Sequence, residues 1–145
     1  MRFLLDAMLG DLACLLRMCG YDAAYALDRG VEADDDLRRL ADREDRVLIT
    51  RDRQLAARAS DGILVIAKDT DEQLRELAAA DVDLSLSPGD RCGACNGDLA
   101  RVSEPTDLPD YVPNDVDALW RCEDCGQYFW RGSHWDDVED RVAEL

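Results

Sequence analysis

Two CxxC pairs, Cys92/Cys95 and Cys122/Cys125, constrain the possible folds of this chain more than any other feature. A CxxC turn supplies two thiolates to one metal ion, and the glycine that closely follows each second cysteine lets the backbone turn tightly around sulfur. Two such turns complete the tetrahedral four-thiolate shell of structural zinc, whereas the competing interpretation is a pair of disulfides in a secreted protein. The spacing predicts a zinc ribbon, whose closed shell leaves no coordination position for catalysis.

The start of the sequence favours zinc over disulfides. Residues 1–6, MRFLLD, lack the long apolar stretch and the small-residue cleavage site of a signal peptide. No apolar run approaches the roughly 20 residues that a membrane helix requires. We therefore expect a cytoplasmic protein with no membrane partner, in a compartment where thiols stay reduced.

The charge composition is extreme. The 145 residues include 33 acidic and 17 basic side chains, the formal net charge is −16, and Lys68 is the only lysine. Dense carboxylates hold hydration and cations in molar salt, where the Debye length falls to about 3 Å, so we expect a halophilic protein. Because screening also weakens repulsion from phosphates, the negative charge does not exclude an RNA partner, and a divalent metal offers a route to phosphate.

Residues 1 to about 82 alternate short apolar runs with helical periodicity, which is typical of an α/β fold with a parallel sheet flanked by helices. The predicted strands are 2–5, 22–27, 47–50 and 63–66, and the predicted helices are 9–19, 34–45, 55–59 and 70–80. We expect Asp34 to cap the second helix. Cys14 and Cys19 fall on the apolar stripe of the first helix and are expected to be core thiols rather than ligands.

The periodic pattern ends in a linker around residues 83–90, which is rich in serine, proline and glycine. We therefore expect two domains, an α/β domain over 1–84 and a zinc ribbon domain over 85–145. Within the ribbon, three prolines at 105, 109 and 113 indicate an irregular loop, and the segments 119–121 and 127–130 are expected to form strands beside the second CxxC pair.

Three aspartates are the candidate catalytic residues. In a parallel α/β sheet, ligands bind beyond the carboxyl ends of the strands, and Asp6 and Asp52 directly follow two predicted strands. Asp34, at the start of the second helix, adds a third carboxylate on the same edge, although Asp35 or Asp36 could replace it. Converging carboxylates are typical of a site for Mg²⁺ or Mn²⁺, which would activate water and stabilise charge in phosphodiester hydrolysis.

Five segments stand out along nearly the whole chain: 3–13 (FLLDAMLGDLA), 18–22 (MCGYD), 47–53 (VLITRDR), 91–97 (RCGACNG) and 130–135 (WRGSHW). In these segments the sequence resembles a known family, the Mut-seven C-terminal ribonuclease domain family. The resemblance implies a PIN-like nuclease fold with an appended zinc ribbon and a metal-dependent ribonuclease activity. It also implies acidic metal ligands at Asp6, Asp52 and Asp34, and zinc on the four cysteines.

One feature departs from the PIN pattern, which usually has a fourth acidic residue. Here Asp11, Asp69 and Asp71 compete for that place, and no motif decides between them. Beside Asp52, Arg51 and Arg53 are candidates for holding phosphate, with ion pairs to the many aspartates as the alternative.

The segment 130–135 contains the only histidine, His134, between Ser133 and a tryptophan. Aromatic and arginine planes bind single-stranded RNA, so we consider Ser133 and His134 as substrate-binding residues; the alternative is that the tryptophans only seal the ribbon against the sheet. Two functions therefore remain open. One is a Mg²⁺- or Mn²⁺-dependent ribonuclease with a structural zinc, and the other is a non-catalytic zinc-ribbon adaptor that binds RNA or protein.

Overall fold

The computed structural model of this protein describes residues 1–103 and 107–145. Its elements in chain order are β1 (Arg2–Leu5), α1 (Gly10–Met18), β2 (Asp22–Tyr25), the single 3-10 turn η1 (Leu27–Arg29), α2 (Asp34–Glu44), β3 (Val47–Thr50), α3 (Arg53–Arg58), β4 (Gly62–Leu64), α4 (Thr70–Ala79), β5 (Leu99–Arg101), β6 (Trp120–Cys122), β7 (Tyr128–Phe129) and α5 (Ser133–Ala143). Pro105, which was expected in the irregular loop, lies outside the described residues. No helix in the described part is long and apolar enough to cross a membrane.

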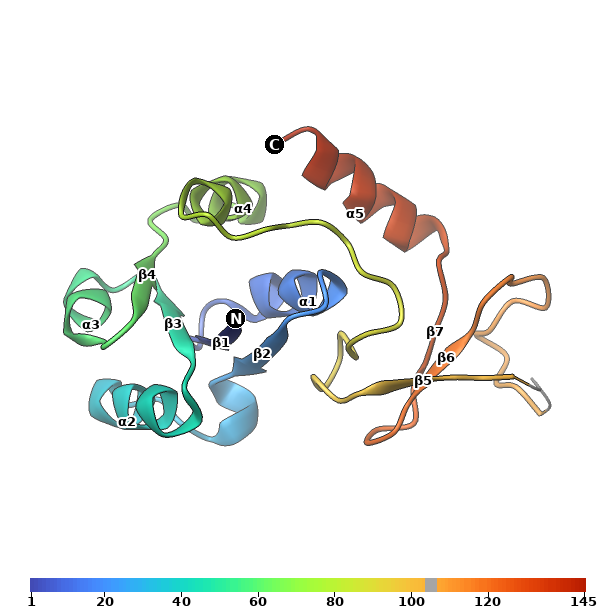
Figure 1. The fold of residues 1–145 in the computed structure, drawn as a ribbon, viewed down its shortest axis with the longest axis horizontal. Coiled ribbons are helices and arrows are strands. Elements are labelled where there is room, and N and C mark those ends of the chain that lie inside the picture. The colour runs from blue at the N-terminus through green and yellow to red at the C-terminus, as the bar shows by residue number, and fades with distance from the viewer. Residues whose placement is uncertain (104–106) are drawn as a thin grey trace.

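The first four strands form a parallel sheet in the order β2-β1-β3-β4 (Figure 1). The chain adds β2 on one side of β1 and then returns to place β3 on the other side. This reversal makes the carboxyl ends of β1 and β3 the topological switch point, which is where open α/β sheets bind their ligands. The predicted parallel α/β sheet flanked by helices is confirmed.

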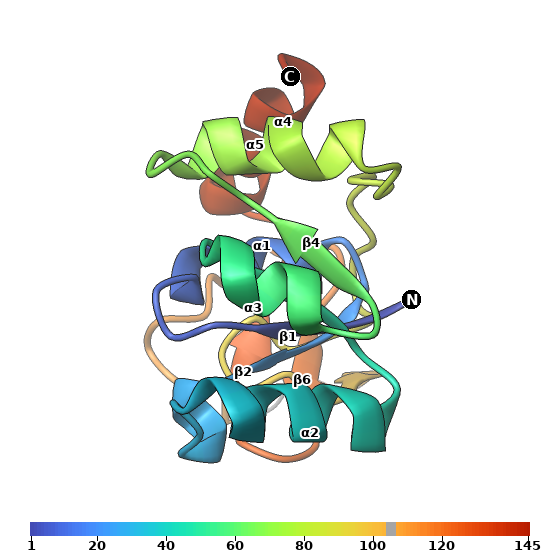
Figure 2. The same ribbon diagram turned by 90° about the vertical axis from the view of Figure 1, so that its left-hand side faces the viewer.

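Helices cover both faces of the sheet (Figures 1 and 2). On one face, α1 and α4 enclose a core that includes Phe3, Leu12 and Leu77, and on the other face Leu37 of α2 and Leu55 of α3 pack beneath β1 and β3. The two central strands, β1 and β3, are buried on both sides, which explains why they read as nearly continuous apolar runs.

Helix α2 corrects one expectation. Its N-cap is Ala33, with no side-chain cap, so the prediction that Asp34 caps this helix is wrong. The helix begins at Asp34 itself, with aspartates at its first three positions. Negative charges there are favourable because they face the positive end of the helix dipole. Asp35 and Asp36 also pair with Arg38 and Arg39 one turn further on.

The second part of the chain is an antiparallel ribbon, β5-β6-β7, followed by α5. The ribbon strands β6 and β7 were expected, whereas β5 and α5 were not. Helix α5 turns back over the α/β part beside α4 (Figure 1), and its Val138 joins the same buried cluster as Leu74 and Leu77 of α4. Arg141 of α5 forms an ion pair with Asp71 of α4, with Nε 2.9 Å from Oδ1. The boundary predicted at residue 84 stays a prediction, and α5 packs across it.

The first CxxC turn lies against the open edge of the sheet. Asn96, which follows Cys95, accepts a hydrogen bond from Ala23 N on β2 and donates one to Asp22 Oδ1. The buried Arg17 of α1 donates to Gly93 O at 2.9 Å and to Ala23 O at 2.9 Å. The edge strand of a sheet has backbone groups that no neighbouring strand pairs with. Here Asn96 of the ribbon provides a partner for one of these groups, the Ala23 amide.

Candidate functional site

The switch point of the sheet holds two of the predicted aspartates. Asp6 follows β1 and Asp52 follows β3, and Thr50, the last residue of β3, lies between them. The Thr50 hydroxyl donates to Asp6 Oδ2 at 2.8 Å and accepts from the Asp52 backbone N at 3.1 Å. Thr50 is fully buried, so this arrangement is fixed by the sheet itself. Sequence analysis did not single out Thr50, although a polar residue ending the apolar run Val47–Thr50 was a usable signal.

Both carboxylates are oriented by the surrounding backbone. The Ala7 amide donates to Asp6 Oδ1 at 2.7 Å, so each oxygen of Asp6 accepts one hydrogen bond. Asp52 is the N-cap of α3, and its Oδ1 accepts from the amides of Gln54 and Leu55. No hydrogen bond within residues 1–103 and 107–145 reaches Asp52 Oδ2. The geometry therefore leaves Asp52 with an oxygen available to a ligand.

Asp34 is not brought into this pair. It is exposed at the start of α2, and no hydrogen bond or ion pair of the described chain joins it to Asp6 or Asp52. Within the described residues, the cysteines form the only group of three or more ligand atoms close enough to share an ion. Two carboxylates are nevertheless sufficient for Mg²⁺, which is usually held by one or two of them together with water and substrate phosphate. Asp6 and Asp52 supply that number of carboxylates at the ends of neighbouring strands.

Further acids gather around Tyr25, the last residue of β2. Burial raises the pKa of the Tyr25 phenol, and the negative charges of Asp28, Asp11 and Asp6 raise this pKa further. The Tyr25 hydroxyl donates to the backbone oxygen of Ala7, in the loop that follows Asp6. Tyr25 and Asp28 were not singled out in the sequence, because no motif marks the turn after β2.

The structure separates the three candidates for a fourth acid. Asp71 is paired with Arg141, and Asp69 is the N-cap of α4, where its Oδ2 accepts from Glu72 N at 3.2 Å. Asp11 is exposed in the first turn of α1, close enough to Tyr25 to act on its phenol. Of the three, Asp11 is therefore the one whose charge acts on the same phenol as the charge of Asp6.

Two arginines flank Asp52 without forming ion pairs in the described part of the chain. Arg53 is exposed, and one amino group of Arg51 donates to Ile66 O at 3.3 Å, while Arg51 Nε is buried without a partner there. The alternative, in which ion pairs to aspartates occupy these two arginines, is therefore not found in the described part of the chain. Their charge is available to a phosphate.

The four cysteines form a closed cluster at the ribbon. All six cysteines of the chain are free, and the four Sγ atoms lie within 4.8 Å of one another. The Sγ distances are 3.7 Å for Cys92–Cys125 and 3.5 Å for Cys95–Cys122. Zinc bound tetrahedrally at about 2.3 Å from each sulfur places sulfurs about 3.8 Å apart, so the cluster fits Zn²⁺. The group is compatible with structural zinc.

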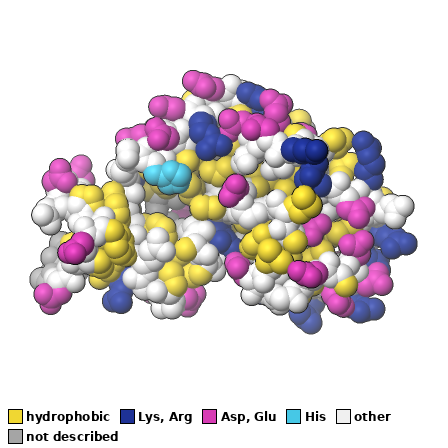
Figure 3. Space-filling view, turned by 180° about the vertical axis from the view of Figure 1, so that it is seen from behind, with side chains coloured by type: hydrophobic (Ala, Val, Ile, Leu, Met, Phe, Trp, Pro, Cys, Tyr) yellow, Lys and Arg dark blue, Asp and Glu magenta, His cyan; other side chains and the backbone are white. Residues whose placement is uncertain are grey.

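Ser133 and His134 are the first two residues of α5, and both are exposed. In Figure 3 the histidine, drawn in cyan, lies at the surface above a hollow. The His134 side chain is therefore not buried in a packing contact. Nothing in the structure tests the substrate-binding role of either residue. The core role expected for Cys14 and Cys19 agrees with their partial burial, which raises the pKa of both thiols.

The family model described as Mut7-C RNAse domain matches residues 1–142. Neither the curated proteins nor the solved structures contain a significant match.

Proposed function

We propose that this chain, which belongs to the Mut7-C RNAse domain family, is a Mg²⁺- or Mn²⁺-dependent ribonuclease that hydrolyses RNA phosphodiester bonds. The family name indicates a nuclease-like function acting on RNA. The observation that carries the proposal is the hydrogen-bonded arrangement of Asp6, Thr50 and Asp52 at the switch point of the sheet. Such a position is where this fold class binds ligands, and carboxylates are the ligands that Mg²⁺ and Mn²⁺ prefer.

In this proposal Asp6 and Asp52 hold the catalytic metal, and Asp34 acts from the start of α2. A bound divalent ion would activate water and stabilise charge on the phosphate. The buried Thr50 positions Asp6, and the Gln54 and Leu55 amides position Asp52. Asp11 supplies a further negative charge on the same side of the sheet.

Arg51 and Arg53 are proposed to bind the phosphates on either side of the scissile bond. Guanidinium groups form strong charge-assisted hydrogen bonds to phosphate oxygens. Ser133 and His134 are proposed to contact the RNA further along the strand. Zinc on the four cysteines is structural in this proposal, because a closed thiolate shell has no open position.

The test is cleavage of labelled single-stranded RNA by zinc-loaded protein with added Mn²⁺, at low and at molar KCl. Asp6→Asn and Asp52→Asn should each lower cleavage by at least about 100-fold, since changes to outer-shell partners alone cost about 10–100-fold. Asparagine remains a good N-cap at position 52. Asp42→Asn is the matched control, because Asp42 is exposed near the other end of α2.

The alternative function, a non-catalytic adaptor, predicts a different result. RNA or a protein would bind to the ribbon, but no cleavage would follow Mn²⁺ addition, and Asp6→Asn would behave as wild type. Equal cleavage by wild type and both asparagine variants would point to a contaminating nuclease and overturn the ribonuclease proposal.

A further inference from the structure

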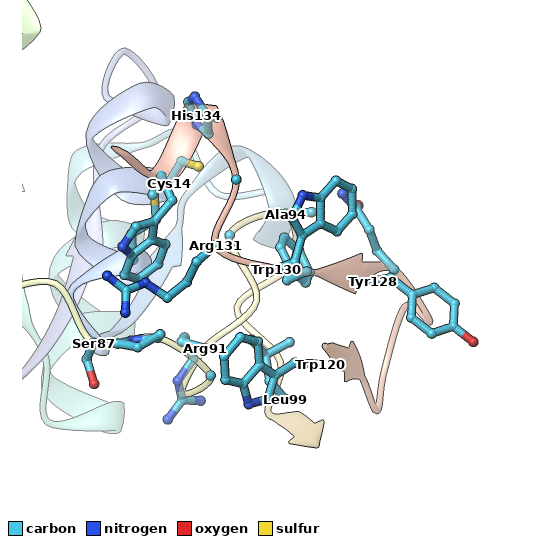
Figure 4. Close-up of a pocket in the computed structure, with 18 of the residues that line it drawn as sticks. Cys14, Ser87, Arg91, Ala94, Leu99, Trp120, Tyr128, Trp130, Arg131 and His134 are labelled. Atoms are coloured by element: carbon cyan, nitrogen blue, oxygen red, sulfur yellow. The ribbon is translucent and has the colours of Figure 1, made fainter. Parts of the chain in front are cut away.

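A cavity of about 430 Å³ lies at the junction of the ribbon with the α/β part. Its lining includes all three tryptophans of the chain, the only histidine and two arginines: Arg91, Trp120, Trp130, Arg131, His134 and Trp135. Figure 4 shows Trp120 and Trp130 on the ribbon side, with Arg131 on the segment that leads into α5 and His134 at the start of that helix. The volume falls in the range of about 300–1,000 Å³ that is usual for small-molecule sites.

The charge of this cavity is opposite to that of the rest of the molecule. No aspartate or glutamate lines it, although 33 of the 145 residues are acidic. The contrast is local, because a second hollow shares Trp120, Trp130 and Arg131 but is lined by three aspartates. A basic, acid-free and aromatic cavity on a strongly acidic protein is complementary to a ligand that combines an anion with a flat ring.

The aromatic walls are held in place by their neighbours. Trp130 stacks on Tyr111, with ring centroids 6.1 Å apart and planes at 25°. Trp120 packs on Gly89, where a Cβ atom would lie only 2.3 Å from the indole nitrogen. Gly89 has φ +82°, a conformation that glycine adopts readily, so this close approach depends on glycine. The cavity is a preformed site and not a loose gap.

Polar donors at the cavity remain unused. Trp135 Nε1 and Arg91 Nε are buried and have no hydrogen-bond partner within the described residues. Arg131 is half-exposed, its guanidinium carbon lies 5.9 Å from the centre of the Trp135 ring, and its ion pair with Glu139 is long at 3.7 Å. Of these groups, Arg131 is the accessible one, and it can donate to a ligand without breaking a strong contact inside the protein.

We propose that this cavity binds one unpaired nucleobase of single-stranded RNA together with its phosphate, outside the acidic site at the switch point. The tryptophan faces stack the base, and Arg131 binds the phosphate. Purines bind more tightly than pyrimidines, because a larger ring gains more from stacking. The proposal rests on the proposed function for the identity of the substrate, and it specifies where an unpaired base of that substrate is held.

The test uses the intrinsic tryptophan fluorescence of the zinc-loaded full chain, which reports on this cavity because every tryptophan lines it. The probe is 5′-AMP, which contains no phosphodiester bond to cleave. We expect saturable quenching by 5′-AMP, weaker binding of 5′-UMP, and weaker binding still of adenosine or of ribose 5-phosphate alone. Asp6→Asn should bind 5′-AMP as wild type does, so a failure of the ribonuclease proposal would not be mistaken for a failure of this one.

Arg131→Glu should weaken 5′-AMP binding by about tenfold or more, and Arg131→Lys should recover part of that loss. Arg58→Ala is the control for a lost positive charge, because Arg58 is exposed on α3. Zinc content and melting temperature of each variant check that the fold is retained. The proposal is overturned if 5′-AMP does not quench, if Arg131→Glu binds normally, or if the cavity takes an apolar peptide in preference to the nucleotide.

Discussion

Asn96 occupies the place of a neighbouring strand beside Ala23 at the edge of the parallel sheet. Its Oδ1 accepts from Ala23 N at 2.9 Å, and its Nδ2 donates to Asp22 Oδ1 at 2.7 Å. One amide side chain thus connects the first CxxC turn to strand β2. Asn96 has φ +70°, which asparagine tolerates better than most residues. The zinc ribbon is therefore part of the sheet edge, and changes at one should be measurable at the other.

Asn96→Gly should lower the free energy of unfolding by about 1–3 kcal/mol, because Ala23 N would lose its partner. Glycine keeps the left-handed backbone conformation, so the change isolates the side chain. Urea unfolding of the zinc-loaded protein measures the effect, and Asn114→Gly, at an exposed position, is the control. Unfolding midpoints that coincide for Asn96→Gly and wild type would show that the contact contributes nothing.

Acid should weaken the same junction. Burial by itself would raise the pKa of Asp22, but hydrogen bonds from Arg46 and Asn96 outweigh it and lower this pKa from 3.8 to about 2. A carboxyl with a depressed folded pKa contributes stability above its unfolded pKa and loses it as the pH falls. Stability should therefore decline between about pH 4 and pH 2. Asp22→Asn should be less stable at neutral pH and should decline less steeply across that window.

Urea midpoints of wild type and Asp22→Asn across this pH range provide the measurement. Glu44 also has a pKa lowered to about 2, by its hydrogen bonds to Arg29 and Arg46, so part of the decline should persist in Asp22→Asn. The zinc content of both proteins is measured at each pH, so that zinc release in acid is separated from the titration of Asp22. If the urea midpoints of the two proteins fell in parallel with pH, the assignment of part of the decline to Asp22 would be contradicted.

Zinc removal should destabilise more than the ribbon. Elemental analysis should give one zinc per chain, and Cys122→Ser should lose it, whereas Cys14→Ser should keep it because Cys14 lies outside the cluster. Zinc-finger peptides bind zinc with about 10–16 kcal/mol, so loss of the metal should unfold β5–β7. Hydrogen exchange should then also accelerate at Ala23, whose partner lies on the first turn. Unchanged protection at Ala23 in the zinc-free protein would show that the two parts are independent.

Thr50→Val should separate positioning from stability. Valine keeps the shape of the buried side chain but cannot donate to Asp6 or accept from the Asp52 amide. If the ribonuclease proposal is right, cleavage should fall by about 10–100-fold, and the Mn²⁺ concentration for half-maximal rate should rise. Thr50→Ser should restore most of both. If Thr50→Ser lost as much activity as Thr50→Val, the effect would be assigned to packing and not to the hydroxyl.

Salt should stabilise this protein if it is halophilic. With a net charge of −16, surface carboxylates repel one another until cations screen them. The melting temperature should rise from low to molar KCl. A melting temperature that stays constant or falls with rising KCl would contradict the halophilic interpretation of the composition.

The sheet could be predicted because its strands carry their own signal. The predicted strand Val47–Thr50 matches β3 at both ends, since a strand buried on both faces reads as a nearly continuous apolar run. Helix α5 carries little signal of this kind: Val138 is its only fully buried residue, and acidic residues surround it in the sequence. Its position depends on a partner surface on α4, which no local pattern describes.

The candidate site also has features that the sequence predicts and features that it does not. The positions of Asp6 and Asp52 at neighbouring strand ends follow from the order of elements and the rule for parallel sheets. The bridge through Thr50 and the edge pairing of Asn96 depend on the register between strands, and register comes from tertiary packing. The same limit explains Asp34: the start of α2 could be placed along the sequence, but not its separation from Asp6.

The return of α5 to the first part of the chain affects the order in which the protein can fold during synthesis. The sheet and its four helices leave the ribosome first, yet Val138 completes the cluster around Leu74 and Leu77. Until residues near 138 emerge, that apolar surface is exposed to solvent and to other nascent chains. Completion of the core is thereby deferred until the segment with the four cysteines has been synthesised, so these thiols can meet a metal ion before the core closes.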